Sequence, residues 1–266
     1  MQSTFPNKHH TNINSIGNSQ NQEYLLTSDD VACFFWSFER PDQPYQMVDI
    51  TGGKKVEEVE ETINFSKMHP TSDSLFMYGT NKGSLRLCDL RIGSNADGNS
   101  LNFKSEFAGN KNFLASMLSS YSSADYSKQG KYIVSRDYLS VKIWDVCNNK
   151  KPVLNVNLND SFKTKLSEMF ENEAIFDKFM VRASPDGNTV ASGSYNNWFH
   201  MVDQDGVNTQ YELSYKKATI ARQMSGKGSA STGKIDYMRK ATALDFHPSK
   251  NMVAVASLNC FFMYAQ

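Results

Sequence analysis

Short runs in which apolar and polar residues alternate recur five times along this chain. Each repeat has one run, a polar turn and a second run, as in residues 132–135 and 141–145. A period of two is typical of β-strands that bury one face. Equivalent positions in the second runs lie 52, 56, 58 and 62 residues apart, at Trp36, Cys88, Trp144, Val202 and Tyr264. Self-similarity near this period predicts β-propeller blades, somewhat longer than a WD repeat of about 40–45 residues.

The paired runs cover residues 24–30 with 34–36, 75–79 with 85–89, 132–135 with 141–145, 190–194 with 199–203, and 253–257 with 261–264. Trp144 and Asp145 form a true WD dipeptide at the end of such a run. We therefore predict an all-β fold, with about five blade units of a WD-repeat β-propeller in a single partial propeller domain over residues 1–266.

Four segments depart from this strand pattern. Apolar side chains fall on one helical face in residues 113–121 and 162–170, with Asp160 or Ser161 as the N-cap of the second helix. We expect both short helices to pack on the rim of the propeller, the alternative being a role in binding a partner. Residues 93–112 and 214–240 are rich in small and polar residues, which predicts flexible loops.

The composition narrows the class of protein. The chain has 28 basic and 28 acidic residues, and this balance excludes the electrostatics of a bulk polyanion binder. No run approaches the about 18 apolar residues of a membrane span, and no signal peptide follows Met1. The scattered cysteines form no CxxC pair: Cys33, Cys88, Cys147 and Cys260. We expect a cytoplasmic protein, with the nucleus as a second location, that binds neither nucleic acid nor a membrane.

Motifs for catalysis are weak or absent. Residues 228–234 nearly match a phosphate-binding loop, but Ile235 stands where the magnesium-binding hydroxyl belongs. His9 and His10 have no third metal ligand within reach in the sequence. We therefore expect no catalytic residues, no cofactor and no metal, and we interpret the chain as a binding protein.

Two acidic clusters fall at matching loops of adjacent repeats. One is Asp29-Asp30, and the other is the run 57–61, in which four glutamates surround Val59. Such runs usually form a solvated face. On neighbouring blades they would instead make a negative patch for a basic ligand.

Several long strings resemble one protein family. They are residues 82–89 (KGSLRLCD), 135–145 (SRDYLSVKIWD), 171–179 (ENEAIFDKF) and 193–197 (GSYNN), with His10-Thr11 and residues 13–16 near the start. Together they resemble the 55-kDa regulatory B subunits of serine/threonine protein phosphatase 2A. The resemblance runs from about residue 5 to the end of the chain and covers the C-terminal portion of the family only.

This resemblance implies a seven-bladed propeller that is not itself an enzyme. Family members join a scaffold subunit and a catalytic subunit, and they recruit phosphoprotein substrates through an acidic, partly apolar platform. The platform positions match Asp30, Val59 (usually Leu in the family) and Tyr195, with Asp29 beside them. The implied mechanism is docking, in which basic substrate side chains meet Asp30 while apolar ones pack on Val59 and Tyr195.

The chain also departs from the family. The opening blades, with the hairpin that grips the scaffold, have no counterpart here, and the last unit ends before a fourth strand. These departures favour an alternative function, a truncated WD-repeat interaction scaffold that no longer binds the phosphatase.

Overall fold

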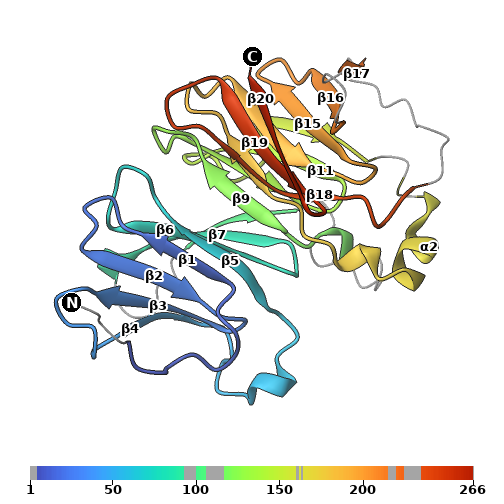
Figure 1. Cartoon of the computed structure of the whole chain (residues 1–266). Coiled ribbons are helices and arrows are strands. Elements are labelled where there is room, and N and C mark those ends of the chain that lie inside the picture. The colour runs from blue at the N-terminus through green and yellow to red at the C-terminus, as the bar shows by residue number, and fades with distance from the viewer. Residues whose placement is uncertain are drawn as a thin grey trace. The chain divides into compact units, whose positions relative to one another are not determined.

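A computed structural model describes residues 5–92, 100–105, 117–159, 162, 164–214, 220–224 and 235–265. The chain divides into two compact units, Met1–Tyr121 and Ser122–Gln266. Among the described residues the strands form five antiparallel sheets, in each of which the strands follow one another in chain order (Figure 1).

The described part of the first unit contains two four-stranded sheets. The first sheet has β1 (Ser15–Asn18), β2 (Tyr24–Ser28), β3 (Ala32–Ser37) and β4 (Tyr45–Asp49). The second has β5 (Ile63–Met68), β6 (Leu75–Thr80), β7 (Ser84–Asp89) and β8 (Leu101–Lys104). Two 3₁₀ turns, η1 (Val56–Glu58) and η2 (Leu90–Ile92), lie in the connections.

The second unit contains sheets of four, five and three strands among its described residues. The first has β9 (Ser123–Tyr126), β10 (Tyr132–Arg136), β11 (Ser140–Asp145) and β12 (Leu154–Asn157). The next has β13 (Val181–Ala183), β14 (Thr189–Gly193), β15 (Trp198–Asp203), β16 (Asn208–Glu212) and β17 (Ile220–Met224). The last has β18 (Ala241–Phe246), β19 (Met252–Ser257) and β20 (Cys260–Ala265). Helix α2 (Leu166–Glu171) and the 3₁₀ turn η4 (Ala174–Phe176) connect the first two sheets.

These sheets confirm the predicted all-β fold of WD-repeat propeller blades. The five aligned positions all fall on the third strand of a sheet, and four of them are buried: Trp36, Cys88, Trp144 and Val202. In four of the five sheets the third strand therefore buries the side chain at this position, and Tyr264 of the last sheet is partly buried.

Consecutive sheets pack through their first strands within each unit. In the first unit β5 lies against β1 and β2, and in the second β13 lies against β9 while β18 lies against β13 and β14. The approach of β14 to β18 depends on Gly193, because a Cβ there would lie 1.7 Å from the carbonyl oxygen of Ala241. The absence of a side chain at Gly193 thus allows two blades to touch.

Some local predictions need correction. The segments 93–112 and 214–240, expected to be loops, contain strands β8 and β17. Each of these strands forms because it can pair with the edge of a sheet, β8 with β7 and β17 with β16. Helix α2 is capped at Lys165 without a side-chain bond, while Asp160 and Ser161 lie outside the described residues. Of the other expected helix only residues 117–121 are described, the first two of them helical. No helix in the described parts of the chain is long and apolar enough to cross a membrane.

Candidate protein-docking site

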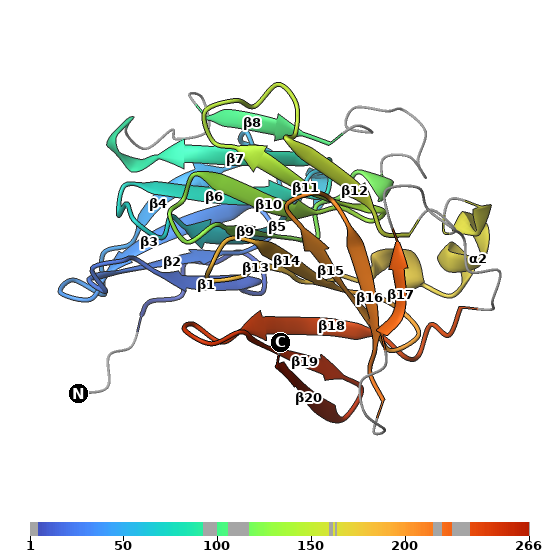
Figure 2. The ribbon, with the colours of Figure 1, turned by 90° about the horizontal axis from the view of Figure 1, so that it is seen from above.

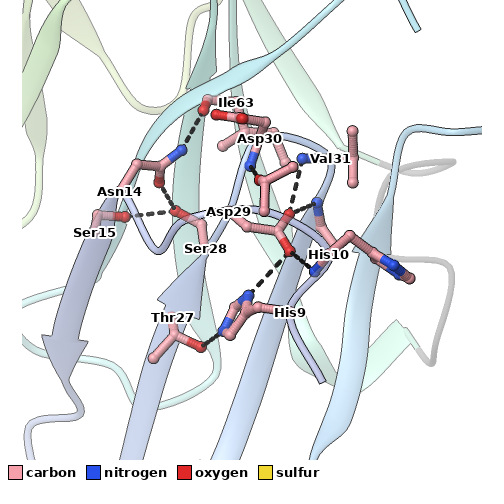
Figure 3. A network of polar contacts seen from close by, with 12 residues as sticks. His9, His10, Asn14, Ser15, Thr27, Ser28, Asp29, Asp30, Val31 and Ile63 are labelled. Atoms are coloured by element: carbon pink, nitrogen blue, oxygen red, sulfur yellow. Dashed lines mark hydrogen bonds and ion pairs between the residues drawn. The ribbon is translucent and has the colours of Figure 1, made fainter. Parts of the chain in front are cut away.

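The predicted docking residue Asp29 lies in the turn between β2 and β3. Its Oδ1 accepts hydrogen bonds from the backbone N–H groups of Val31 (2.8 Å) and Ala32 (2.7 Å). Its Oδ2 accepts from the N–H of His10 at 2.9 Å and lies 3.0 Å from Nδ1 of His9 (Figure 3). The side chain therefore ties the turn to the segment that precedes β1.

A chain of polar side chains continues from this carboxylate into the sheet. Indole Nε1 of Trp36 donates to Oγ1 of Thr27 at 2.7 Å, and that hydroxyl lies 2.7 Å from Nε2 of His9. Because an indole can only donate, Thr27 Oγ1 accepts from Trp36, and the hydroxyl makes a further hydrogen bond with Nε2 of His9. Because an ionised carboxylate can only accept, Nδ1 of His9 carries a proton and donates it to Oδ2 of Asp29.

Burial and hydrogen bonding act in opposite directions on Asp29. The side chain is fully buried, and burial by itself raises the pKa of this carboxyl. The hydrogen bonds from the amides of Val31, His10 and Ala32 and from His9 outweigh it and bring the pKa below its ordinary value. Asp29 is thus a buried carboxylate without accessible surface, and we correct its predicted role from touching a substrate to holding the loop.

The third sheet repeats this arrangement. Nε1 of Trp144 donates to Oγ of Ser135 at 2.9 Å, as Trp36 does to Thr27. Asp137 accepts from the amides of Leu139 and Ser140, and Lys142 takes the place of His9 as the side-chain partner of the carboxylate. The recurrence indicates that the network stabilises a blade and is not itself a binding site.

Asp30, the next residue, is held differently. Its N–H donates to Oγ1 of Thr11 at 3.1 Å, and its carbonyl accepts from the N–H of Ile63, the first residue of β5, at 2.8 Å. Its side chain is partly exposed, and no contact described for this part of the chain engages the carboxylate. Both backbone groups of Asp30 are therefore fixed while its carboxylate keeps its acceptor positions open (Figure 3).

Val59 lies at the same end of the first unit as Asp30. It follows η1 and packs, partly buried, against a cluster formed by Val31, Ala32, Phe34 and Trp36. Glu57, Glu58 and Glu60 around it are exposed. Apolar packing between Val59 and Val31 therefore connects the two acidic segments. The side chain of Val59 lies between exposed carboxylates.

Tyr195 belongs to the second unit, where it begins the turn between β14 and β15. The next two residues, Asn196 and Asn197, have φ angles of 61° and 58°. Two central residues with positive φ define the type I′ hairpin turn, in which asparagine is favoured. This turn explains the Tyr-Asn-Asn string found in the sequence.

The ring of Tyr195 is 1% exposed, so the exposed platform contact predicted for it needs correction. Its hydroxyl lies 2.6 Å from the carbonyl oxygen of Ala174 and 2.8 Å from Oδ2 of Asp177, which also pairs with Lys240. Its ring packs edge-on against Phe162, Phe179 and Tyr237. Burial raises the pKa of Tyr195, which stays a neutral donor supporting the surface above it.

The remaining motifs add no chemistry to this site. His9 is committed to Thr27 and Asp29, and no cluster of metal-ligating side chains occurs among the described residues. The segment 228–234, which resembled a phosphate-binding loop, lies outside them.

Sequence reasoning missed the ion pair of Asp177 with Lys240, and residue spacing carries no signal for it. The sequence does carry a signal for the network around Asp29. Thr27, Asp29 and Trp36 have the same spacing as Ser135, Asp137 and Trp144, which form the equivalent network.

Comparison with known proteins supplies the family. The chain matches no protein-family profile. It is 32% identical over 277 residues to a serine/threonine-protein phosphatase 2A regulatory subunit, phr2AB, of Dictyostelium discoideum, covering 98% of this chain and 57% of that protein. It is 33% identical over 274 residues to the protein phosphatase PP2A 55 kDa regulatory subunit of Drosophila melanogaster, covering 98% of this chain and 54% of that protein. The chain spans about half the length of these curated relatives. Over that span, this protein resembles the 55 kDa regulatory subunits of protein phosphatase 2A.

Proposed function

We propose that this chain is a non-catalytic regulatory subunit of a protein phosphatase 2A, which recruits phosphoproteins with basic motifs to a catalytic subunit. The similarity over 98% of the chain to two proteins named as such subunits supports the regulatory role. The observation that carries the docking role is Asp30, whose backbone is fixed on both sides while its carboxylate is open.

The docking mechanism follows from the chemistry of this end of the first unit. An arginine or lysine of the substrate donates charge-assisted hydrogen bonds to Asp30. An apolar substrate side chain packs on Val59, and the exposed glutamates around Val59 favour the approach of a positively charged segment. Asp29 acts indirectly, since it holds the loop that carries Asp30.

The same proposal includes the partners and the location. The phosphate ester is hydrolysed by another chain, which holds the catalytic metals, and a scaffold subunit brings the two together. We place this assembly in the cytoplasm and the nucleus.

The first test is purification of the tagged chain from its native lysate, followed by mass spectrometry. Recovery of scaffold and catalytic subunits supports the proposal. A soluble chain that recovers neither supports the alternative, a WD-repeat interaction scaffold without the phosphatase.

The second test isolates the docking site. The change Asp30→Lys should weaken binding of a basic phosphopeptide by about tenfold or more, since it puts like charges in contact. The exposed Asp42→Lys makes the same change in net charge and serves as the matched control. Equal peptide affinity of the two variants would count against Asp30 as the docking residue.

A further inference from the structure

The insertion formed by α2 and η4 carries an exposed aromatic pair. Phe170 is 43% exposed and Phe176 is 58% exposed, and their ring centroids lie 6.2 Å apart. Phe170 was expected on the buried face, but α2 has only six residues and its last turn faces outward. Figures 1 and 2 both show α2 outside the strands of the second unit. Large exposed aromatic side chains in contact with each other are typical of binding surfaces.

This pair is mounted on a well-anchored segment. Met169, Ala174 and Ile175 are buried beneath it. The carbonyl oxygen of Ala174 accepts hydrogen bonds from the hydroxyls of Tyr195 (2.6 Å) and Tyr138 (3.2 Å). An anchored aromatic side chain loses little conformational entropy when a partner covers it, which is why such residues dominate binding energies.

A sharp reversal of the backbone brings the two rings together. Glu173 adopts a left-handed conformation with φ 56°, and the side chain of Asn172 donates to the carbonyl of Glu168 at 2.7 Å. The insertion therefore presents both rings on one surface formed by α2 and η4.

The surroundings of the pair are acidic. Between residues 166 and 176 the chain has three glutamates, Glu168, Glu171 and Glu173, and no basic residue. All three are exposed, and Lys165 and Lys178 stand just outside the stretch. The hydroxyl of Tyr237 donates to Glu168 at 3.0 Å, and the neighbouring Met238 is 77% exposed. The surface thus combines apolar area with negative charge.

We propose that Phe170 and Phe176, with their glutamates, form a second protein-docking surface whose partner is a positively charged, amphipathic segment. The apolar side of that segment covers the two rings, and its lysines or arginines face Glu171 and Glu173. Like-charged or wholly polar segments are rejected, since they would leave the aromatic area or the carboxylates without a complement. This surface shares no residue with the Asp30 site and does not depend on the function proposed there.

The test uses the full chain and a fluorescent synthetic peptide of about 18 residues, with leucines at helical i, i+3, i+4 and i+7 positions and lysines elsewhere. Anisotropy titration at about 50 mM and about 300 mM salt measures the affinity of the peptide and the electrostatic contribution to its binding. The double variant Phe170→Ser/Phe176→Ser should bind about tenfold more weakly or worse. Val153→Ser, which removes a 64% exposed apolar side chain elsewhere in the unit, should bind as the unchanged protein does.

Charge reversal provides a second arm that does not touch the aromatic pair. Glu171→Lys/Glu173→Lys changes only exposed side chains, so it keeps the fold and should also lose about tenfold in affinity at low salt. Three results would overturn the proposal. They are unchanged peptide affinity in this variant, equal binding of a peptide with glutamates in place of lysines, and a loss of peptide affinity that occurs in Asp30→Lys but in neither variant of this surface.

Discussion

Replacement of Asp29 by alanine gives the sharpest test of the network under the docking loop. The carboxylate accepts from the amides of Val31, Ala32 and His10 and from the ring of His9. Each buried donor left unpaired costs about 1–3 kcal/mol. The two fully buried amides therefore cost about 2–6 kcal/mol, and we expect the free energy of unfolding to fall by about 4 kcal/mol. That is a large share of the about 5–15 kcal/mol that stabilises a typical domain.

Asparagine at this position separates the two halves of the network. Asp29→Asn keeps one oxygen for the amides of Val31 and Ala32, but it turns an NH₂ group toward the donors of His10 and His9. We expect an intermediate loss of about 2 kcal/mol, because only the second pair of bonds is broken. Asp42→Ala, on the exposed surface, should stay within about 0.5 kcal/mol of the unchanged chain.

The assay is urea unfolding of the full chain, followed by circular dichroism and by tryptophan fluorescence. Trp36 belongs to the network and reports on it directly. A stability of Asp29→Ala equal to that of Asp42→Ala would refute the assignment of Asp29 as the residue that holds the turn.

Two further perturbations test the packing and the buried histidine of the second unit. Gly193→Ala should destabilise the chain by about 3 kcal/mol or more, because its Cβ would overlap the carbonyl of Ala241, and thermal unfolding would show this as a lowered Tm. A variant that keeps its Tm would contradict the close approach of β14 to β18. Burial lowers the pKa of His200 to about 4, below the about 6.5 of an unfolded histidine, so the unfolded chain binds more protons between these values. This contribution is fully present above about pH 6.5 and is lost at up to about 1.4 kcal/mol per unit as the pH falls toward 4, and His200→Gln should flatten that part of the stability profile.

The strands and their repetition are predictable from the order of apolar and polar residues. Alternating runs, with a residue such as Trp36 or Trp144 at the same place in each, follow from the two-residue period of a strand and the need to bury one face. The string GSYNN likewise specified its turn, because asparagine tolerates positive φ. The two acidic clusters of neighbouring repeats adjoin one apolar cluster, since Val59 packs against Val31.

The exposure of these side chains, by contrast, depends on tertiary packing. Asp29 and Asp30 are neighbours of the same type, yet one is buried by the segment around His9 and the other keeps an open carboxylate. Tyr195 is covered by rings from residues 162, 179 and 237, and Phe170 is turned outward by a helix too short to bury it. Burial depends on what distant segments place over a residue, and local periodicity holds no information about those segments.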